Sequence, residues 1–515
     1  MDQYVLSILI FLPVLAALGL MLMPTKDPRA IKTYAFVASL FNVVFAISLL
    51  ATFDRSQSGY QFVVDNPWLP SLGIHYHLGL DGISLVLVML TTLLLPFSIL
   101  GSWDLIKDKL KGYYAMLLLL SAGMTGAVLS LDVFLFYVFF EMMLVPAFFL
   151  IGIWGGPKRV GATVKFVIYT MVGSLFMFVA LLYLVMQHHT VSGVWSFQLA
   201  DLLSTPLSGL AMWLCFIAFF LAFAIKSGLF PFHTWAPDTY VEAPAPVTFL
   251  VSGVMGKIGA YGFIRFALPL FPVAASTARP VLMGLAMLGL LYSAWVALAQ
   301  TDIKRLLAYS SISHMAVIML GIFSLDPQAW SGAVFMFMAH AVATGGLFLV
   351  TGMLAERKGT SISDFGGIAR AVPWLTTAFL LVALASIGLP GLNGFIGEFL
   401  ILLGSFNAQH IIAAIATTSV IWAACYMLWM ISRTFFGEYQ APPKGKPVLK
   451  DLSVREAFIL VPLAAVIIVT GFAPQPVLNR INPAVQAALG ALQKSASLPT
   501  PVKTAAKLPG AGEKE

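Results

Sequence analysis

Long apolar stretches follow one another along nearly the whole chain, and this pattern constrains the fold more than any other feature. Hydrophobic residues make up 60% of the 515, charged residues only 10%, and the mean hydropathy is +0.93. Soluble domains carry about 25% charged residues, and a water-soluble core cannot hide this much apolar surface. The sequence therefore predicts an all-α membrane protein, because helices pair their own backbone groups inside lipid.

A helix needs about 20 apolar residues to cross a bilayer. This length divides the sequence into about fourteen candidate spans, namely 4–23, 31–52, 81–101, 112–130, 132–154, 165–187, 208–241, 243–268, 279–299, 306–323, 328–354, 373–407, 410–436 and 455–474. The first stretch has no basic region before it and no clear cleavage site, so we interpret it as a span rather than a removed signal. The last residues, 475–515, are rich in Ala, Pro and Lys, and are predicted to form a partly disordered tail.

The basic residues of the loops are distributed unequally. Nineteen Lys and Arg residues fall in or beside odd-numbered loops, whereas the even-numbered loops hold only Arg55, Arg265 and Arg279. Short loops rich in Lys and Arg remain on the cytoplasmic side. We therefore predict a bacterial inner-membrane protein with both termini on the periplasmic side. The net charge of +7 is explained by this topology, and nucleic acid is not an expected partner.

Two predicted spans are longer than a membrane requires. Residues 208–241 and 373–407 cover about 34 and about 35 residues, whereas about 20 residues suffice. Each has a Gly/Pro-rich break near its middle, GLFPF at 228–232 and GLPGLNG at 388–394. Proline removes an amide donor and clashes with the preceding turn. Both spans are therefore predicted to be helices interrupted inside the membrane, although such segments can also kink only for packing.

The two breaks occupy matching places in the chain. They fall in the seventh and twelfth spans, so each lies in the fourth span of a five-span unit, spans 4–8 or 9–13. Because five is odd, the second unit enters the membrane from the opposite side, which is the pattern of an inverted repeat. The predicted organisation is a three-span segment, two inverted five-helix repeats, a last span and a tail: 1–111, 112–268, 279–436, 455–474 and 475–515.

Four ionisable residues lie well inside predicted spans: Glu141, Lys226, Lys257 and Glu398. A charge at the centre of a bilayer costs about 2.5–3.5 kcal/mol. A carboxylate and an amine at one depth can form an ion pair, and moving the carboxylate changes whether the amine keeps its proton. These residues are candidates for a proton relay. The alternative is a set of buried salt bridges that only fix the packing of the helices.

Three histidines lie in or near the membrane: His233, His314 and His340. Histidine titrates near neutral pH and suits a supporting place in a relay. A core histidine bonded to a backbone carbonyl is an equally good interpretation of any one of them, and a haem between His314 and His340 is a further alternative. Neighbouring hydroxyls can order water or tie helices together: Ser310, Ser311, Ser313 and Thr344.

The sequence contains no recognisable cofactor motif. Its two cysteines, Cys215 and Cys425, both lie in apolar runs, which excludes a disulfide framework and a cysteine-ligated iron–sulfur cluster. No dinucleotide-binding or Walker-type glycine motif is present. We therefore expect no cofactor or metal bound by this chain.

Several long motifs carry a family resemblance. They are KSGLFPFHTWAPDTYVEAPAPVTFLVSGVMGKIGAYGFIR at 226–265, QTDIKRLLAYSSISHM at 300–315, FFEMMLVP and GLPGLNGFIGEF. With these motifs, essentially the whole chain resembles the antiporter-like, proton-translocating subunits of respiratory complex I, NADH-quinone oxidoreductase. Subunits of multi-component Na⁺/H⁺ antiporters and membrane-bound hydrogenases share the pattern. Among three related complex I subunits, the residue after the second break is glutamate in one type, as Glu398 is here.

The resemblance implies a role for each candidate residue. Glu141 matches the glutamate that pairs with the lysine of the seventh span, Lys226, and Lys257 matches the connecting lysine. Glu398 matches the terminal acid, and the two central histidines match the polar axis of the family.

The resemblance also implies the molecular context. NADH, FMN, iron–sulfur clusters and quinone, such as ubiquinone, are expected in partner subunits, and neighbouring antiporter-like subunits are the expected partners. The alternatives are a cation antiporter or hydrogenase subunit without NADH coupling, and a purely structural scaffold.

Overall fold

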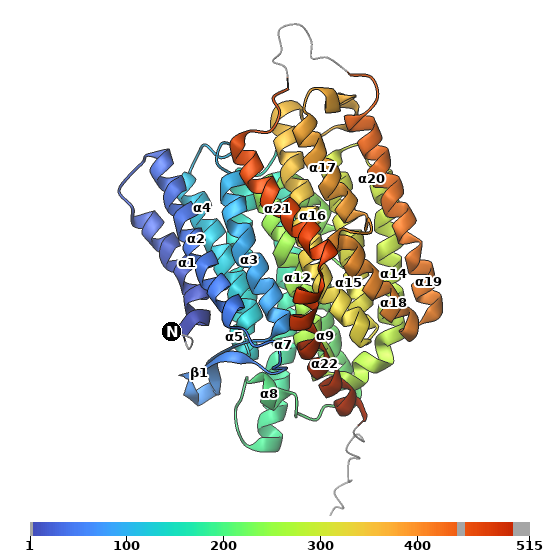
Figure 1. Ribbon diagram of the computed structural model, residues 1–515. Coiled ribbons are helices and arrows are strands. Elements are labelled where there is room, and N and C mark those ends of the chain that lie inside the picture. The colour runs from blue at the N-terminus through green and yellow to red at the C-terminus, as the bar shows by residue number, and fades with distance from the viewer. Residues whose placement is uncertain (1–3, 440–448, 498–515) are drawn as a thin grey trace, which may run out of the picture.

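The computed structural model describes residues 4–439 and 449–497, which form a bundle of long helices (Figure 1). In the described part, 13 helical segments are long and apolar enough to cross a membrane. The first half contains α1 (Val5–Leu22), α2 (Pro28–Thr52), α3 (Gly82–Gly101), α4 (Leu110–Leu129), α5 (Val133–Met142), α6 (Leu144–Trp154), α7 (Arg159–Ser192), α8 (Leu199–Leu202), α9 (Gly209–Ser227), α10 (Trp235–Glu242), α11 (Ala245–Leu250), α12 (Gly256–Gly262) and α13 (Leu268–Leu270).

The second half contains α14 (Pro272–Leu298), α15 (Ile303–Phe323), α16 (Pro327–Lys358), α17 (Pro373–Ser386), α18 (Asn393–Ala408), α19 (His410–Thr417), α20 (Ser419–Phe435), α21 (Val454–Phe472) and α22 (Gln475–Ser497). Short 3₁₀ turns are η2 (Pro70–Leu72), η5 (Ile362–Asp364) and η6 (Ile368–Arg370). Aspartate side chains begin several of the long helices by accepting bonds from the first free backbone amides: Asp27, Asp81, Asp132, Asp302 and Asp326.

Both predicted helix breaks are confirmed. Helix α9 ends at Ser227 and is capped by Gly228, whose φ of +68° suits glycine. Helix α10 begins after the Phe230–Pro231 segment. The other break separates α17 from α18 and has two glycines with positive φ, Gly388 and Gly391. Counted as one interrupted span, α17 and α18 complete the predicted set of about fourteen. The inverted relation of the two five-span units stays a prediction.

The sequence suggested a plain α-helix for the eighth span, whereas the structure shows an irregular one. Two π-helical segments, η3 (Val251–Met255) and η4 (Phe263–Ala267), lie on either side of α12. Such π segments are rare and often mark functional sites. Lys257 therefore lies on a short α-helical turn between two irregular ones, in the middle of the membrane-spanning segment Ala245–Leu270.

The structure contains a β-hairpin and a helix outside the predicted spans that the sequence analysis did not predict. Strands β1 (Gln61–Leu69) and β2 (Ile74–Leu80) form an antiparallel hairpin, in the loop between the second and third spans. The hairpin lies at the end of the bundle where α8 and α22 are also found (Figure 1). Residues 475–497 of the predicted tail form helix α22, whereas the region beyond 497, predicted to be disordered, lies outside the described residues.

Two basic residues assigned to loops lie in helices instead. Arg265 is buried within η4, and Arg279 lies inside α14, where it donates a hydrogen bond to the carbonyl of Ala408 at 3.1 Å. Both lie near the end of an apolar run, and hydropathy alone does not locate the end of a helix to within a turn.

The middle of the bundle is unusually well enclosed. Every residue in the most apolar window of Ala245–Leu270 is buried, and 94% are buried in the corresponding windows of α15 and α16. By contrast, only 28% of the α2 window and 33% of the α21 window are buried. The central spans are thus surrounded by protein, and these are the spans that carry Lys257, His314 and His340.

Candidate functional site

Lys257 lies at the centre of the candidate site and is completely buried. Its Nζ lies 2.5 Å from the backbone oxygen of Ser252 and 2.5 Å from Nδ1 of His340. Ser252 belongs to η3, in which the wider turn brings its carbonyl to the lysine five residues later. A lysine ammonium has three donors and no acceptor, so it donates to this carbonyl and to the lone pair of His340.

The histidines continue the line toward the second break. Nε2 of His340 lies 3.3 Å from Oγ of Ser311, and the rings of His340 and His314 have centroids 5.7 Å apart. Nε2 of His314 lies 3.4 Å from Oε1 of Glu398. The four titratable side chains of Lys257, His340, His314 and Glu398 therefore follow one another from α12 through α16 and α15 to α18. We name them the central line.

Glu398 owes its position to the break before α18. A Cβ at Gly388 would lie 2.6 Å from Oε2 of Glu398, so the glycine leaves room for the carboxylate. Buried polar atoms gather here without a hydrogen-bond partner in the described chain, among them Nδ1 of His314, Oγ of Ser386 and the side-chain amide of Asn393. Buried polar groups in proteins are paired almost without exception, by ordered water where protein groups do not serve.

Lys226 lies in the last turn of α9, directly before the first break, and is 2% exposed. The ion pair that we expected with Glu141 does not form within 4.0 Å among the described residues. Instead the Lys226 ammonium faces the ring of Phe140, 4.6 Å from its centroid. Glu141 is half-buried on α5 and acts on Lys226 only through its longer-range charge. Lys226 therefore makes a cation–π contact with Phe140 in place of the expected ion pair.

His233 lies apart from the central line. Its ring packs between those of Phe230 and Tyr292, at centroid distances of 5.7 and 5.3 Å. No hydrogen bond joins it to Lys257, His314 or His340 within the described chain. The sequence showed that His233 follows the first break, but not that this break turns it toward α14.

A buried cluster around Arg265 was missed in the sequence analysis. Its guanidinium donates to the carboxylate of Asp81 at 2.5 Å and to the hydroxyls of Tyr60 at 2.9 Å and Tyr261 at 3.1 Å. Burial alone would raise the pKa of Asp81, but the charge and hydrogen bonds of Arg265 keep it below its usual value. Asp81 and Arg265 are 184 residues apart, and no local pattern connects them.

The geometry does not suit a haem between His314 and His340. Both nitrogens of His340 contact protein groups, Nδ1 the amine of Lys257 and Nε2 the hydroxyl of Ser311. Across residues 4–439 and 449–497, no group of three or more His, Cys, Asp or Glu side chains could hold a metal ion.

Known proteins resemble this chain over nearly its full length. The family model described as "NADH:quinone oxidoreductase/Mrp antiporter, TM" matches residues 130–422. NADH-quinone oxidoreductase subunit M of Rhodobacter capsulatus is 40% identical, over 94% of this chain and 96% of the relative. Subunit M of Escherichia coli K12 is also 40% identical, over 83% of this chain and 85% of the relative.

Solved structures agree with these relatives. A chain of respiratory complex I from Thermus thermophilus has a TM-score of 0.85 and 34% identity, covering 95% of this chain and 99% of that one. A chain of the Mrp complex from Dietzia shares the fold at 20% identity, with a TM-score of 0.83. The matched model covers more than half of the chain and the relatives nearly all of it, and the chain therefore belongs to the NADH:quinone oxidoreductase/Mrp antiporter family, with NADH-quinone oxidoreductase subunit M among its relatives.

Proposed function

We propose that this protein translocates protons across the membrane as a subunit of NADH:quinone oxidoreductase, respiratory complex I. The observation that carries the proposal is the central line, in which four titratable side chains cross the enclosed middle of the bundle. A charge placed in a membrane without pairing is costly, and such residues are typical of ion pathways. A bundle that served only as a scaffold would not require such a line.

In the proposed route, a proton reaches Lys226 from the basic, cytoplasmic end of the bundle. It passes to Lys257 and then along the central line to Glu398, from which it is released toward the periplasmic end. The close approach of α9 and α12 supports the first transfer, since a Cβ on Gly259 would lie 2.7 Å from the amide nitrogen of Ser227. In this route, the negative charge of Glu141 influences whether Lys226 keeps its proton.

Histidine suits the middle of this route because each ring has two nitrogens. A proton accepted at Nδ1 of His340 releases the one held at Nε2, so charge passes through the ring without a large movement. Moving one charge against 100 mV requires about 2.3 kcal/mol. In this proposal that energy comes from quinone reduction by NADH in partner subunits, which hold the FMN and iron–sulfur clusters, and it arrives through neighbouring antiporter-like subunits in the inner membrane.

The test uses the assembled complex reconstituted in proteoliposomes. Lys226→Ala, Glu141→Ala and Glu398→Gln are compared with Glu438→Gln, a matched change at an exposed position. NADH oxidation, proton uptake and the content of assembled complex are measured together. We expect normal assembly with proton translocation reduced by about tenfold or more in Lys226→Ala and Glu398→Gln, and no change in Glu438→Gln.

The alternatives predict other outcomes. Loss of Na⁺/H⁺ exchange without any effect on NADH-driven translocation would indicate a cation antiporter subunit. Normal translocation in all variants would indicate a scaffold and overturn the proposal.

A further inference from the structure

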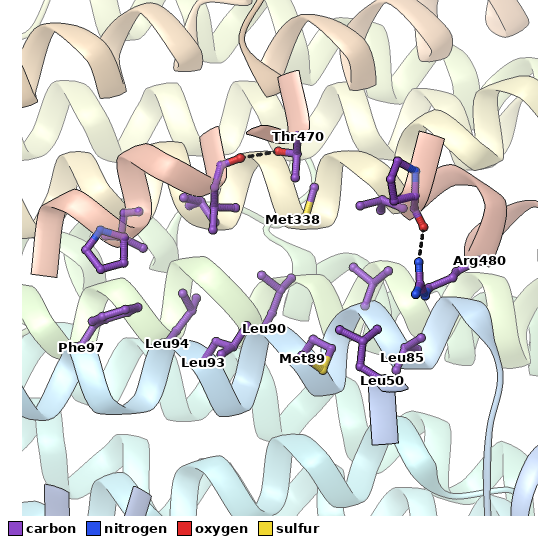
Figure 2. A pocket seen from close by; sticks show the side chains of 17 residues that line it. Leu50, Leu85, Met89, Leu90, Leu93, Leu94, Phe97, Met338, Thr470 and Arg480 are labelled. Atoms are coloured by element: carbon purple, nitrogen blue, oxygen red, sulfur yellow. Dashed lines mark hydrogen bonds between the residues drawn. The ribbon is translucent and has the colours of Figure 1, made fainter. Parts of the chain in front are cut away.

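A groove with an almost entirely apolar lining runs along α3 (Figure 2). Its volume is about 430 Å³, within the range of about 300–1,000 Å³ typical of small-molecule sites. Helices α2, α16, α21 and α22 form its other walls. Along α3 it extends from Leu85 to Phe97, which is about 18 Å at ~1.5 Å per residue. One leaflet of the hydrocarbon core is about 15 Å thick.

The groove opens sideways at the depth of the membrane. Leu90 and Leu94 form its floor and are 4% and 2% exposed. Met89, Leu93 and Phe97 line it as well but are only half-buried. Its walls include the membrane-spanning segments α3, α16 and α21. A hydrocarbon chain can therefore enter it from the bilayer.

Arg480 lies at one end of the groove, opposite Phe97 (Figure 2). Its Nη1 donates to the carbonyl of Pro476 at 2.6 Å, but its buried Nε has no hydrogen-bond partner within the described chain. Helix α22 is held at this place by close packing on the start of α3. A Cβ at Gly82 would lie 1.8 Å from the carbonyl oxygen of Arg480, so only glycine allows α22 to pack there.

The positive charge of a second arginine, Arg55, also acts on Arg480. Burial and then the nearby charge of Arg55 lower the pKa of Arg480, so an anion here would relieve the repulsion between the two. Neither arginine forms an ion pair with a carboxylate in the part of the chain that the structure describes. The carboxylate of Asp54 is engaged by the amide and hydroxyl of Ser56. Guanidinium groups with free donors are well suited to bind phosphate.

We propose that this groove binds an anionic phospholipid, with one acyl chain along α3 and the phosphate on Arg480. A zwitterionic lipid such as phosphatidylcholine brings a choline cation together with its phosphate, so it would neutralise less of the positive charge than an anionic lipid. A helix of a partner protein is the other occupant that a groove of this length could take, and the experiment below distinguishes it from a lipid. The apolar length of the groove and the arginine at its end thus favour an anionic lipid.

The proposal is tested with a photo-crosslinking amino acid at Met89 in the complete complex, reconstituted in mixed phosphatidylglycerol and phosphatidylcholine. The control places the same amino acid at Val461, which is 64% exposed on α21 and does not line the groove. Mass spectrometry gives the ratio of anionic to neutral lipid attached at each position. We expect a several-fold higher ratio at residue 89 than at residue 461, and no competition by added inorganic phosphate.

Two variants make the result specific. Arg480→Gln should lower the ratio at residue 89 to that at residue 461, whereas Arg433→Gln, a matched change on α20, should not. Leu90→Trp should fill the groove and abolish lipid attachment at residue 89. Equal ratios at the two positions, attachment of a neighbouring subunit at residue 89, or an unchanged ratio in Arg480→Gln would each overturn the proposal.

Discussion

The contacts of Lys257 determine which proton positions are available in the central line. Because its ammonium donates to Nδ1 of His340 at 2.5 Å, that nitrogen must present a lone pair. The proton of the neutral imidazole then lies on Nε2, which faces the hydroxyl of Ser311 at 3.3 Å. This tautomer is assigned from the hydrogen-bond pattern. In the proposed relay, it allows His340 to take the lysine proton at Nδ1 and to release its own from Nε2.

Replacing His340 with Gln tests this role. Glutamine can still accept a hydrogen bond from Lys257, but it cannot carry a proton, so we expect normal assembly and translocation reduced by about tenfold or more. NADH-driven proton uptake in proteoliposomes is the measurement. His188→Gln is the matched control, because His188 bonds Thr205 at 2.9 Å in a different part of the bundle. Wild-type uptake in His340→Gln would exclude a relay through this ring.

The Asp81–Arg265 pair is a structural feature, and its loss should affect stability rather than transport. Asp81→Asn leaves a buried guanidinium without its counter-charge, which costs about 3–5 kcal/mol. We expect a lower thermal midpoint and less assembled complex in detergent. Asp65→Asn is the control, since Asp65 pairs with His75 at a half-exposed site, and adding Arg265→Gln to Asp81→Asn should restore much of the loss.

The pKa of Asp81 also predicts how this effect depends on pH. Since the folded protein holds that pKa below its usual value, the pair stabilises the fold at every pH above the usual value. Its contribution is lost only as the pH falls through the lowered pKa. The difference between Asp81→Asn and wild type should therefore stay constant across the neutral range. A difference that disappears near neutral pH would contradict this assignment.

At the scale of helices, the two breaks were predictable from sequence because glycine and proline act locally. The π segments around Lys257 were not, since the sequence 251–267 carries no proline and a π turn differs from an α turn by one residue. Helix α22 was missed because its sequence is weakly apolar and contains Pro483. It is stabilised by packing on α3 and α16, which hydropathy does not describe.

Gly259 sets the distance between the helices that carry Lys226 and Lys257. A Cβ there would lie 2.7 Å from the amide nitrogen of Ser227 and 2.8 Å from the carbonyl of Phe223. Backbone atoms cannot move aside as a flexible side chain can, so Gly259→Ala should force α9 and α12 apart at a cost of about 1–3 kcal/mol.

We expect Gly259→Ala to lower both the thermal midpoint and the rate of proton translocation. Gly284→Ala on α14 is the matched control, because no atom lies within 4 Å of its Cβ position. The two variants should be compared in the same preparation, by thermal unfolding and by NADH-driven proton uptake. If both behave like wild type, the close approach of α9 and α12 is not required for transport.

At the scale of the whole molecule, the bundle has two chemically different ends. The end with the hairpin and α8 is low in Lys and Arg, whereas the loop at 102–111 at the opposite end carries Lys107, Lys109 and Lys111. The positive-inside rule predicts that the second end lies in the cytoplasm. The proposed direction of transport, from Lys226 toward Glu398, depends on this orientation.

Cysteine labelling in intact cells tests the orientation. With Cys215 and Cys425 replaced by alanine, a membrane-impermeant maleimide should label Ser58→Cys, before the hairpin, but not Lys107→Cys. Both positions are exposed on the protein surface, so only the membrane should limit the access of the reagent. As a control, Lys107→Cys should be labelled once the cells are opened. Labelling of Lys107→Cys in closed cells would reverse the orientation and the direction of transport.

The sequence by itself determined the membrane class, the spans, the two breaks and the four ionisable residues within the spans. These features are local, because a bilayer penalises each exposed polar group separately and a proline acts on its own turn. The tertiary structure alone decided which of these groups meet. Lys257 and His340 are 83 residues apart and lie in contact, whereas Glu141 and Lys226 were expected to pair and do not. Such contacts depend on how helices distant in the chain pack together, and hydropathy carries no information about that packing.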